Sequence, residues 1–463
     1  MRIMSRRTLW LGIAVLAATP SVAFGQQASA QRSISLDEAI AEALQGNAGL
    51  AIARAGTDVA HADAKQASSY LWPRIDVATG WTRSDDPVFA FGTKLRQGIF
   101  TESDLALDAL NNPDPISDWA TGATLEWKLL SPQVWAGRSA ASSAAEAADW
   151  QELRTREATV LQTEVLYYEA QRAAAQTRAA EWSEDAARSA RDVFTRREAE
   201  GFLTRAEVLQ AEADLQGAVA ARIDAERRES DAYRQLAVFL GWGPEVKPVL
   251  TDTLRLAVVD PRGGDSAAGS SVAGSTELAG FDPTLRADLH ALDRARDAAA
   301  ANSSRAKLGY LPELDAFAGY SMHGSGLFQS DGDNWVGGLA LRWNIFSGLS
   351  RSADTKRADA QRAMAETEYD ATLRSARAEV LGASDAVDAA RRAASAAVVG
   401  DSAASLGRDL MRMRFDEGLA TATDLLAADS RAAQARSRAI NATAGYRMAE
   451  ARLRYVTTQH TSE

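Results

Sequence analysis

A motif of glycine, threonine and an acidic residue, each three positions apart, occurs twice in the chain. Its members are Gly201, Thr204 and Glu207 in the first copy and Gly418, Thr421 and Asp424 in the second. Glycine readily takes the left-handed conformation that ends a helix. Threonine followed three residues later by an acid is a capping box that begins the next helix. The motif therefore predicts two helix–turn–helix tips, each carrying a carboxylate.

Residue types that usually carry catalysis or bind metals are sparse. The chain has no cysteine, which excludes disulfides, thiolate metal sites and a cysteine nucleophile. Its 4 histidines are scattered, and none pairs at the i, i+4 spacing of a helical zinc motif. No phosphate-binding glycine loop or nucleophile–base spacing is present. We therefore predict that the chain is not an enzyme and uses no cofactor or metal.

The net charge and the first residues of the chain suggest where the protein works. The formal charge of −11 argues against a nucleic-acid partner. Residues 1–25 have the basic start, short apolar run and small residues of a secretory signal, with cleavage predicted after Gly25 or Ala30. No later run of 18 apolar residues occurs, so no membrane-spanning helix is predicted.

Two pairs of segments predict duplicated β-strands. Residues 72–82 resemble residues 311–321, and residues 119–131 resemble residues 335–347. Apolar and polar side chains alternate in them, which is typical of a half-buried strand. Each segment is near the length of about 9–11 residues that a membrane strand needs.

Long helices are predicted to follow each pair of strands. Residues 136–197 and 351–414 contain no proline and are rich in Ala, Arg, Glu and Gln. A helix of this length would span roughly 90 Å. Apolar residues at steps of three and four, such as Val380, Ala383 and Val387, form a heptad-type seam. Because alanine dominates the seams, we expect helices packed closely side by side.

The chain therefore divides into two repeats of the same order of elements. The first repeat is predicted over residues 33–241 and the second over residues 282–459, each with an opening helix, two strands, a long helix, a tip and a return helix. Residues 242–281 between them form an insert, whose glycine- and serine-rich part at 258–276 is predicted to be a flexible linker. The predicted fold class is mainly α, with a smaller β part.

With these elements in order, the chain resembles the TolC-type outer membrane efflux family. The resemblance covers nearly all of the chain after the signal and rests on residues 36–40, the strand starts at Pro73 and Pro312, and the two tip motifs. It implies a homotrimer in the outer membrane of a Gram-negative bacterium, in contact with outer-membrane lipid. Three chains would form a 12-stranded β-barrel, continued by a 12-helix periplasmic tunnel.

The resemblance also implies a function and partners. Members of the family act as passive exit ducts of tripartite efflux or type I secretion systems, together with a periplasmic adaptor protein and an inner-membrane transporter. The insert at 242–281, with the C-terminal tail, would form an equatorial collar around the tunnel. The aromatic residues near the predicted strand ends agree with a barrel's aromatic girdles, but they agree equally with the ordinary preference of aromatic residues for strands.

In the family the tips close the tunnel, and the resemblance assigns gate positions to this chain. Asp424 matches an acidic ring that favours hydrated cations, Glu207 matches an acidic latch position, and Asp429 is a further candidate acid. Glu207 and Asp424 could equally serve only as capping acids, and the two roles can coexist. The turn residues would contact the adaptor or be purely structural: Gly201, Thr204, Gly418 and Thr421.

Three positions depart from the family's pattern. Phe415 stands where a tyrosine would donate a latching hydrogen bond, and phenylalanine has no such donor. Ala420 replaces an arginine that would pair with an acid, and Ala427 replaces the second acid of the ring. The gate is therefore predicted to close through other contacts, with Arg205 or Arg414 as the candidates.

A periplasmic or secreted coiled-coil scaffold is the alternative interpretation. It would account for the heptads but not for the duplicated strands. Solubility would distinguish the two interpretations, because a scaffold would dissolve without detergent whereas a duct would partition with outer membranes.

Overall fold

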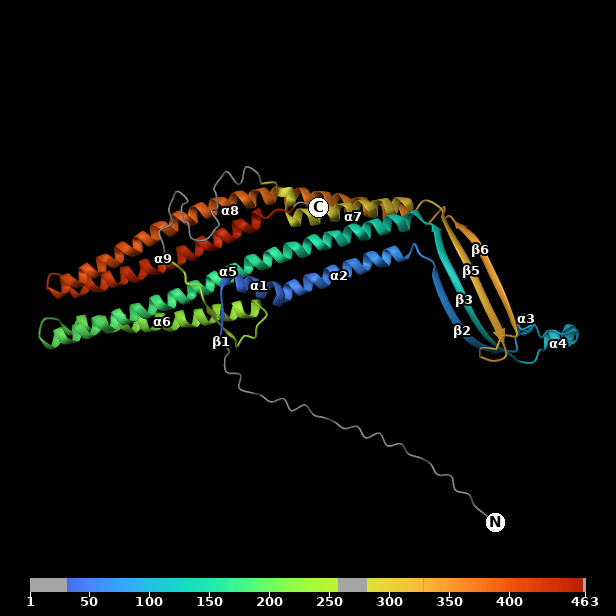
Figure 1. The fold of residues 1–463 in the computed structure, drawn as a ribbon, viewed down its shortest axis with the longest axis horizontal. Helices are drawn as coiled ribbons and strands as arrows, with labels where there is room; N and C mark the ends of the chain where they lie inside the picture. Colours follow the sequence, from blue (N-terminus) through green and yellow to red (C-terminus); the bar gives the residue numbers. More distant parts are fainter. Residues whose placement is uncertain (1–30, 257–280, 328, 461–463) are drawn as a thin grey trace, which may run out of the picture.

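The computed structural model describes residues 31–256, 281–327 and 329–460. In this part of the chain, long helices extend from a four-stranded sheet at one end to two helical turns at the other (Figure 1). The predicted signal at 1–25 and the predicted linker at 258–276 lie outside the described residues.

The opening helix of the first repeat is broken in two, whereas the sequence predicts a single helix. A short strand, β1 (Gln31–Ile34), precedes α1 (Leu36–Gly46) and α2 (Ala48–Ser69). Ser35 begins α1 with a capping box. Asn47 ends α1 and also caps α2, since its side chain accepts from the amide of Leu50 at 3.1 Å. The side-chain amide nitrogen of Asn47 donates to the carbonyl of Phe239 at 3.0 Å. This bond fixes the break between α1 and α2 against the helix that ends at Phe239.

Four antiparallel strands form the sheet, in the order β2-β3-β5-β6. They are β2 (Arg74–Ser84), β3 (Ile116–Leu130), β5 (Glu313–Gly324) and β6 (Gly332–Arg342). The registers place Trp81 opposite Trp119 and Tyr320 opposite Trp335. β6 ends at Arg342 instead of continuing to 347, because the chain then turns into the next helix through left-handed Gly348 and Leu349, with φ of 62° and 68°.

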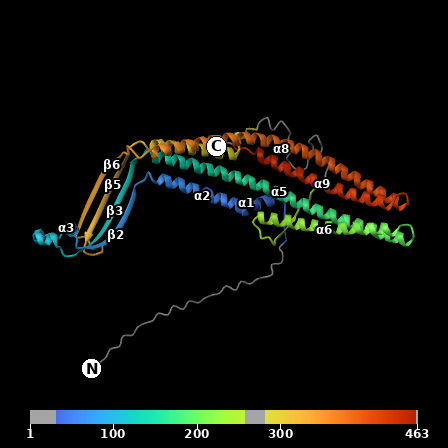
Figure 2. The same cartoon turned by 180° about the vertical axis from the view of Figure 1, so that it is seen from behind.

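Two long helices leave the sheet and carry the tips. α5 (Pro132–Ala199) and α8 (Ser350–Asp416) contain 68 and 67 residues. The return helices α6 (Arg205–Phe239) and α9 (Ala422–Thr457) run back along them. A 3₁₀ turn, η3 (Pro283–Leu285), precedes α7 (Ala287–Leu308), which packs between α5 and α8. Both hairpin tips lie at the end away from the sheet (Figure 2).

The core is a series of narrow seams between helices. Val380, Ala383, Val387 and Ala394 of α8 are buried in a cluster with residues of α9 such as Tyr446. Small side chains let neighbouring helix backbones approach closely, so the contact extends over many turns. None of the helices in the described ranges is long and apolar enough to cross a membrane.

The described part of the insert and the C-terminal tail attach to different repeats. β4 (Lys247–Leu250) pairs in parallel with β1 of the first repeat. The amide of His460 donates to the carbonyl of Leu285 at 2.7 Å, at the start of the second repeat. Both attachments lie along the middle of the long helices (Figure 1).

The segment between β2 and β3 folds at the far end of the sheet. It contains α3 (Pro87–Arg96), η1 (Glu102–Leu105) and α4 (Leu107–Asn111). A buried polar cluster ties it to the strands: His323 Nδ1 lies 2.8 Å from one carboxylate oxygen of Asp118, and Gln97 donates to the other at 2.9 Å.

Candidate functional site at the helical tips

Both tips turn through a left-handed glycine, as the motif predicts. Gly201 has φ of 84° and Gly418 has φ of 76°. At the first tip, the amide of Phe202 donates to the carbonyl of Arg197 at 2.8 Å. The amide of Gly201 donates to the carbonyl of Glu198 at 2.9 Å. These two bonds are the Schellman arrangement that satisfies the last carbonyls of a helix. The second tip repeats them at equivalent residues.

The acid of each motif forms the expected capping box. Glu207 accepts from the amide and hydroxyl of Thr204 at 2.7 and 2.8 Å. Asp424 accepts from the amide and hydroxyl of Thr421 at 3.1 and 2.7 Å. Each carboxylate thus satisfies donors at a helix start, where the partial positive charge of the helix also favours an anion.

The capping contacts keep both acids ionised. The hydrogen bonds from Thr204, first from its amide and then from its hydroxyl, hold the pKa of Glu207 below its usual range. The hydroxyl and amide of Thr421 do the same for the pKa of Asp424, and the charges of Arg414 and Arg431 lower it further. Bonding to the charged form is what lowers a carboxylate pKa. Both tips therefore carry negative charge at neutral pH.

Asp429 lies in a different setting from Asp424. It is on α9, a distance of ~7.5 Å along the helix axis from Asp424. Burial raises the pKa of Asp429, and the charges of Arg408 and Arg412 on α8 oppose that rise only in part. Asp429 is therefore partly buried, whereas Asp424 is exposed.

Two phenylalanines join the tips of the two repeats. Phe194 of α5 and Phe415 of α8 are buried with exposed fractions of 0% and 2%. Their ring centroids are 5.3 Å apart, within the range of favourable aromatic pairs. Val208 and Leu425 from the return helices complete the cluster. Phe415 therefore contributes apolar packing between the repeats.

An arginine from α5 supplies the polar link between the tips. Arg197 donates to the carbonyls of Phe415 and Asp416 at 2.8 and 3.0 Å. Its guanidinium carbon also lies 4.3 Å from the centroid of the Phe415 ring, a cation–π distance. The two carbonyls belong to the last turn of α8, which carries partial negative charge. We call these contacts of Arg197 with Phe415 and Asp416 the Arg197 clamp.

The clamp differs from the pairings that the sequence suggested. Arg205 lies 3.8 Å from Glu198, which belongs to the same tip, so this pair does not join the repeats. Arg414 acts on Asp424 through its charge. Arg197 itself occupies the position equivalent to Arg414 in the duplicated motif. The alignment of the two repeats shows that Arg197 and Arg414 are equivalent. It does not indicate which of the two side chains contacts the other repeat.

A second polar contact supports the clamp further along the helices. Arg412 of α8 donates to the hydroxyl of Ser189 on α5 at 3.0 Å. Within the first hairpin, Arg191 of α5 lies 3.1 Å from Glu212 of α6. Across the residues that the structure describes, no group of three or more His, Asp and Glu side chains is placed to hold a metal ion.

Known structures share this architecture. The Campylobacter jejuni CmeC outer membrane channel matches with a TM-score of 0.78 at 16% identity, over 92% of this chain and 87% of the channel. The Vibrio cholerae outer membrane protein VceC matches with a TM-score of 0.73 at 19% identity, over 92% of this chain and 96% of VceC. The open state of the Neisseria gonorrhoeae MtrE outer membrane channel matches with a TM-score of 0.72 at 18% identity, over 91% of this chain and 88% of MtrE.

At this level of identity the likeness concerns the fold. No curated protein matches the sequence. The family model described as outer membrane efflux protein matches residues 39–242 and 278–458. That match covers both repeats and leaves out most of the insert. The family and the similar structures are channels rather than enzymes. The chain belongs to the outer membrane efflux protein family.

Proposed function

We propose that the protein is the outer-membrane exit duct of a tripartite efflux or type I secretion system. It would act as a passive conduit with a gate at its periplasmic tips. The observation that carries the proposal is a four-stranded sheet whose edge strands, β2 and β6, have no partner strand among the described residues, and whose strands lead into the long helices. A coiled-coil scaffold would not require such a sheet.

The open edges support assembly of three chains into one barrel. An unpaired edge presents free backbone donors and acceptors, and closing the sheet satisfies them. Large apolar side chains on the edge strands are exposed, including Val77 and Trp81 of β2 and Trp335 and Leu339 of β6. Exposed aromatic and aliphatic side chains on strands suit contact with lipid. Three copies would supply 12 strands and a tunnel of 12 helices.

Cross-linking between strand edges tests the trimer. The natural chain has no cysteine, so every label site is introduced. Thr79→Cys in β2 combined with Gly337→Cys in β6 should give a covalent ladder that ends at three chains with a short bifunctional maleimide in outer membranes. The matched control, Ala123→Cys in β3 with Ala318→Cys in β5, should cross-link only within one chain. A ladder ending at two chains, or no ladder, would contradict the trimer.

The tip acids would form the cation-selective part of the gate. Glu207 and Asp424 are ionised at neutral pH, and three copies of each would gather negative charge around the threefold axis. The Arg197 clamp would hold the two hairpins of one chain together when the gate is closed. Asp429, which is partly buried, is the weakest of the three acidic candidates.

Single-channel conductance separates gating from capping. Glu207→Gln and Asp424→Asn remove the charge but leave a side-chain oxygen for the cap, whereas Glu207→Ala and Asp424→Ala remove both. If the acids select ions, the amide variants should lose cation preference while keeping the tip folded. If all four variants conduct like the natural protein with the same cation preference, the gate assignment is wrong.

Exposed apolar residues at the tips suit contact with a periplasmic adaptor. Phe202 and Leu419 follow Gly201 and Gly418 at equivalent positions, and their side chains are 77% and 64% exposed. The same turn therefore offers an apolar side chain at both tips. Co-purification of the adaptor with the natural protein and with Phe202→Ser/Leu419→Ser, with exposed Arg196→Ser as the control, would test this contact. Equal recovery of adaptor with all three proteins would contradict it.

A further inference from the structure

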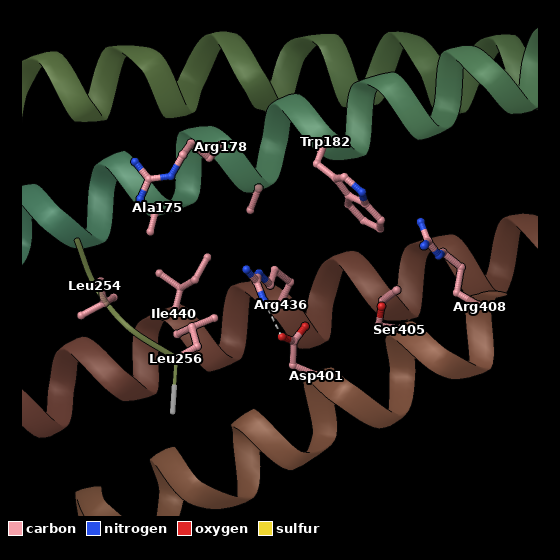
Figure 3. A pocket seen from close by; sticks show the side chains of 12 residues that line it. Ala175, Arg178, Trp182, Leu254, Leu256, Asp401, Ser405, Arg408, Arg436 and Ile440 are labelled. Carbon is pink, nitrogen blue, oxygen red and sulfur yellow. Dashed lines mark hydrogen bonds and ion pairs between the residues drawn. The ribbon is translucent and has the colours of Figure 1, made fainter. Parts of the chain in front are cut away.

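A cavity with a volume of about 390 Å³ lies between the two repeats, well away from the tips. It is bounded by α5 on one side and by α8 and α9 on the other, with residues 254–256 crossing one end (Figure 3). Arg178 at its border is exposed, whereas Ile440 is 2% exposed. The cavity therefore reaches from the surface to the packed core, and its volume is at the lower end of the ~300–1,000 Å³ of ligand pockets.

The lining of the cavity combines an apolar body with an excess of positive charge. Its large apolar side chains are Trp182, Leu254, Leu256 and Ile440. Three arginines line it and only one acid: Arg178, Arg408, Arg436 and Asp401. Asp401 accepts from Arg436 at 2.7 Å, so that pair is neutral overall. Arg408 pairs with Asp409, so the net positive charge at the cavity comes from Arg178, which lies toward the opposite end from Arg408 in Figure 3.

Arg408 lines this cavity and carries one unpaired hydrogen-bond donor. Its guanidinium carbon lies 4.6 Å from the centroid of the Trp182 ring, and one terminal nitrogen pairs with Asp409, which does not line the cavity. Its Nε is buried and has no hydrogen-bond partner. Leaving a buried donor unpaired is costly. The planar guanidinium fork matches the oxygens of a carboxylate or sulfonate.

We propose that this cavity binds a small organic anion that has one apolar ring system and one carboxylate or sulfonate group. The ring system would pack against Trp182 and Ile440, and the anionic oxygens would accept from the guanidinium of Arg408. Arg178 would add attraction through its charge. Because the lining comes from α5, α8 and α9, a bound anion would join the first repeat to the second. The proposal does not depend on the exit-duct function.

Titration calorimetry with 1-naphthoate tests the site on the full-length protein in lipid nanodiscs. We expect one site per chain for 1-naphthoate and at least tenfold weaker binding of 1-naphthamide, which has the same ring without the charge. Arg408→Gln should weaken 1-naphthoate binding by about tenfold, as expected for loss of a charge-assisted hydrogen bond. Ala179→Phe should abolish binding by filling the cavity, since Ala179 lines it.

Two further variants control for fold and for general surface charge. Arg362→Gln removes an exposed arginine of α8 that pairs with Glu366 away from the cavity, and it should leave binding unchanged. Exposed Arg178→Gln should weaken binding by about threefold through loss of one nearby charge, and it provides a test if Arg408→Gln does not fold. Equal binding of 1-naphthamide and 1-naphthoate, or equal losses in the Arg362, Arg178 and Arg408 variants, would overturn the proposal.

Discussion

Arg197 of α5 donates to the main-chain carbonyl of Phe415 of α8 at 2.8 Å, and its guanidinium lies over the ring of the same residue. One side chain thus contacts both the backbone and the side chain of the other repeat. The contact occupies the last turn of α8, immediately before the turn at Gly418. Any movement that separates the two tips of a chain must break it.

The first prediction concerns this clamp. Arg197→Met keeps an apolar stem for the ring of Phe415 but removes the donors to the two carbonyls. We expect a larger or more frequently open conductance in planar bilayers, because the closed tips lose their polar link. Arg196→Met is the matched control, since Arg196 is its exposed neighbour. Identical conductance of the two variants would show that Arg197 does not hold the gate.

The second prediction concerns the left-handed glycines. Gly201→Ala should destabilise the tip by about 1–2 kcal/mol, because a side chain disfavours positive φ, although a Cβ there would meet no atom within 4 Å. Amides at 196–204 should then exchange with deuterium faster. Gly217→Ala inside α6 also meets no atom within 4 Å, and it should slow exchange in that helix. If the amides at 196–204 exchange at the same rate in Gly201→Ala as in the natural protein, the tip does not depend on the left-handed conformation of Gly201.

The third prediction concerns pH and a buried ion pair at the start of α7. Asp288 accepts from Arg286 at 2.6 Å, and the Arg286 side chain is 3% exposed. Burial works to raise the pKa of Asp288, but the hydrogen bond from Arg286 and the charge of Arg154 lower it on balance. A carboxyl with a lowered folded pKa stabilises the fold above its ordinary value of ~3.9, and that stabilisation is lost as pH falls through the lower folded value.

Thermal unfolding of Asp288→Asn tests this relationship. The melting temperature of the variant should fall below that of the natural protein at pH 7, and the difference should shrink as pH drops below about 4. Asp293→Asn in the same helix is the control, because its partner Arg296 is 39% exposed and exposed pairs contribute little. A difference that stays constant from pH 7 to pH 3 would rule out the ion pair as its source.

The fourth prediction concerns the segment between β2 and β3. Gln97→Ala leaves one oxygen of buried Asp118 without its protein donor, which should cost about 1–3 kcal/mol. We expect faster protease cleavage within residues 87–111 in outer membranes, because α3 loses its tie to the strands. Asn112→Ala, an exposed change in the same segment, should leave the cleavage rate unchanged. Equal rates for both variants would mean that Gln97 does not anchor the segment.

Sequence alone determined the features that depend on neighbours along the chain. The tips follow from Gly201 and Gly418 and from the capping boxes that begin at Thr204 and Thr421. Helix ends and caps use bonds between residues three to five apart, so their residue types reveal them. The long helices, and the alternation of apolar and polar side chains in β3, likewise follow from residues that are close together in the sequence.

Tertiary contacts decided the rest. Tyr167 is fully buried, because the first hairpin packs around the described part of the insert and around β1. The break at Asn47 depends on Phe239, and the clamp depends on which of two equivalent arginines reaches the other repeat. The partners in these contacts are about 200 residues apart in sequence, and helical periodicity fixes which residues share a face but not which helix that face meets.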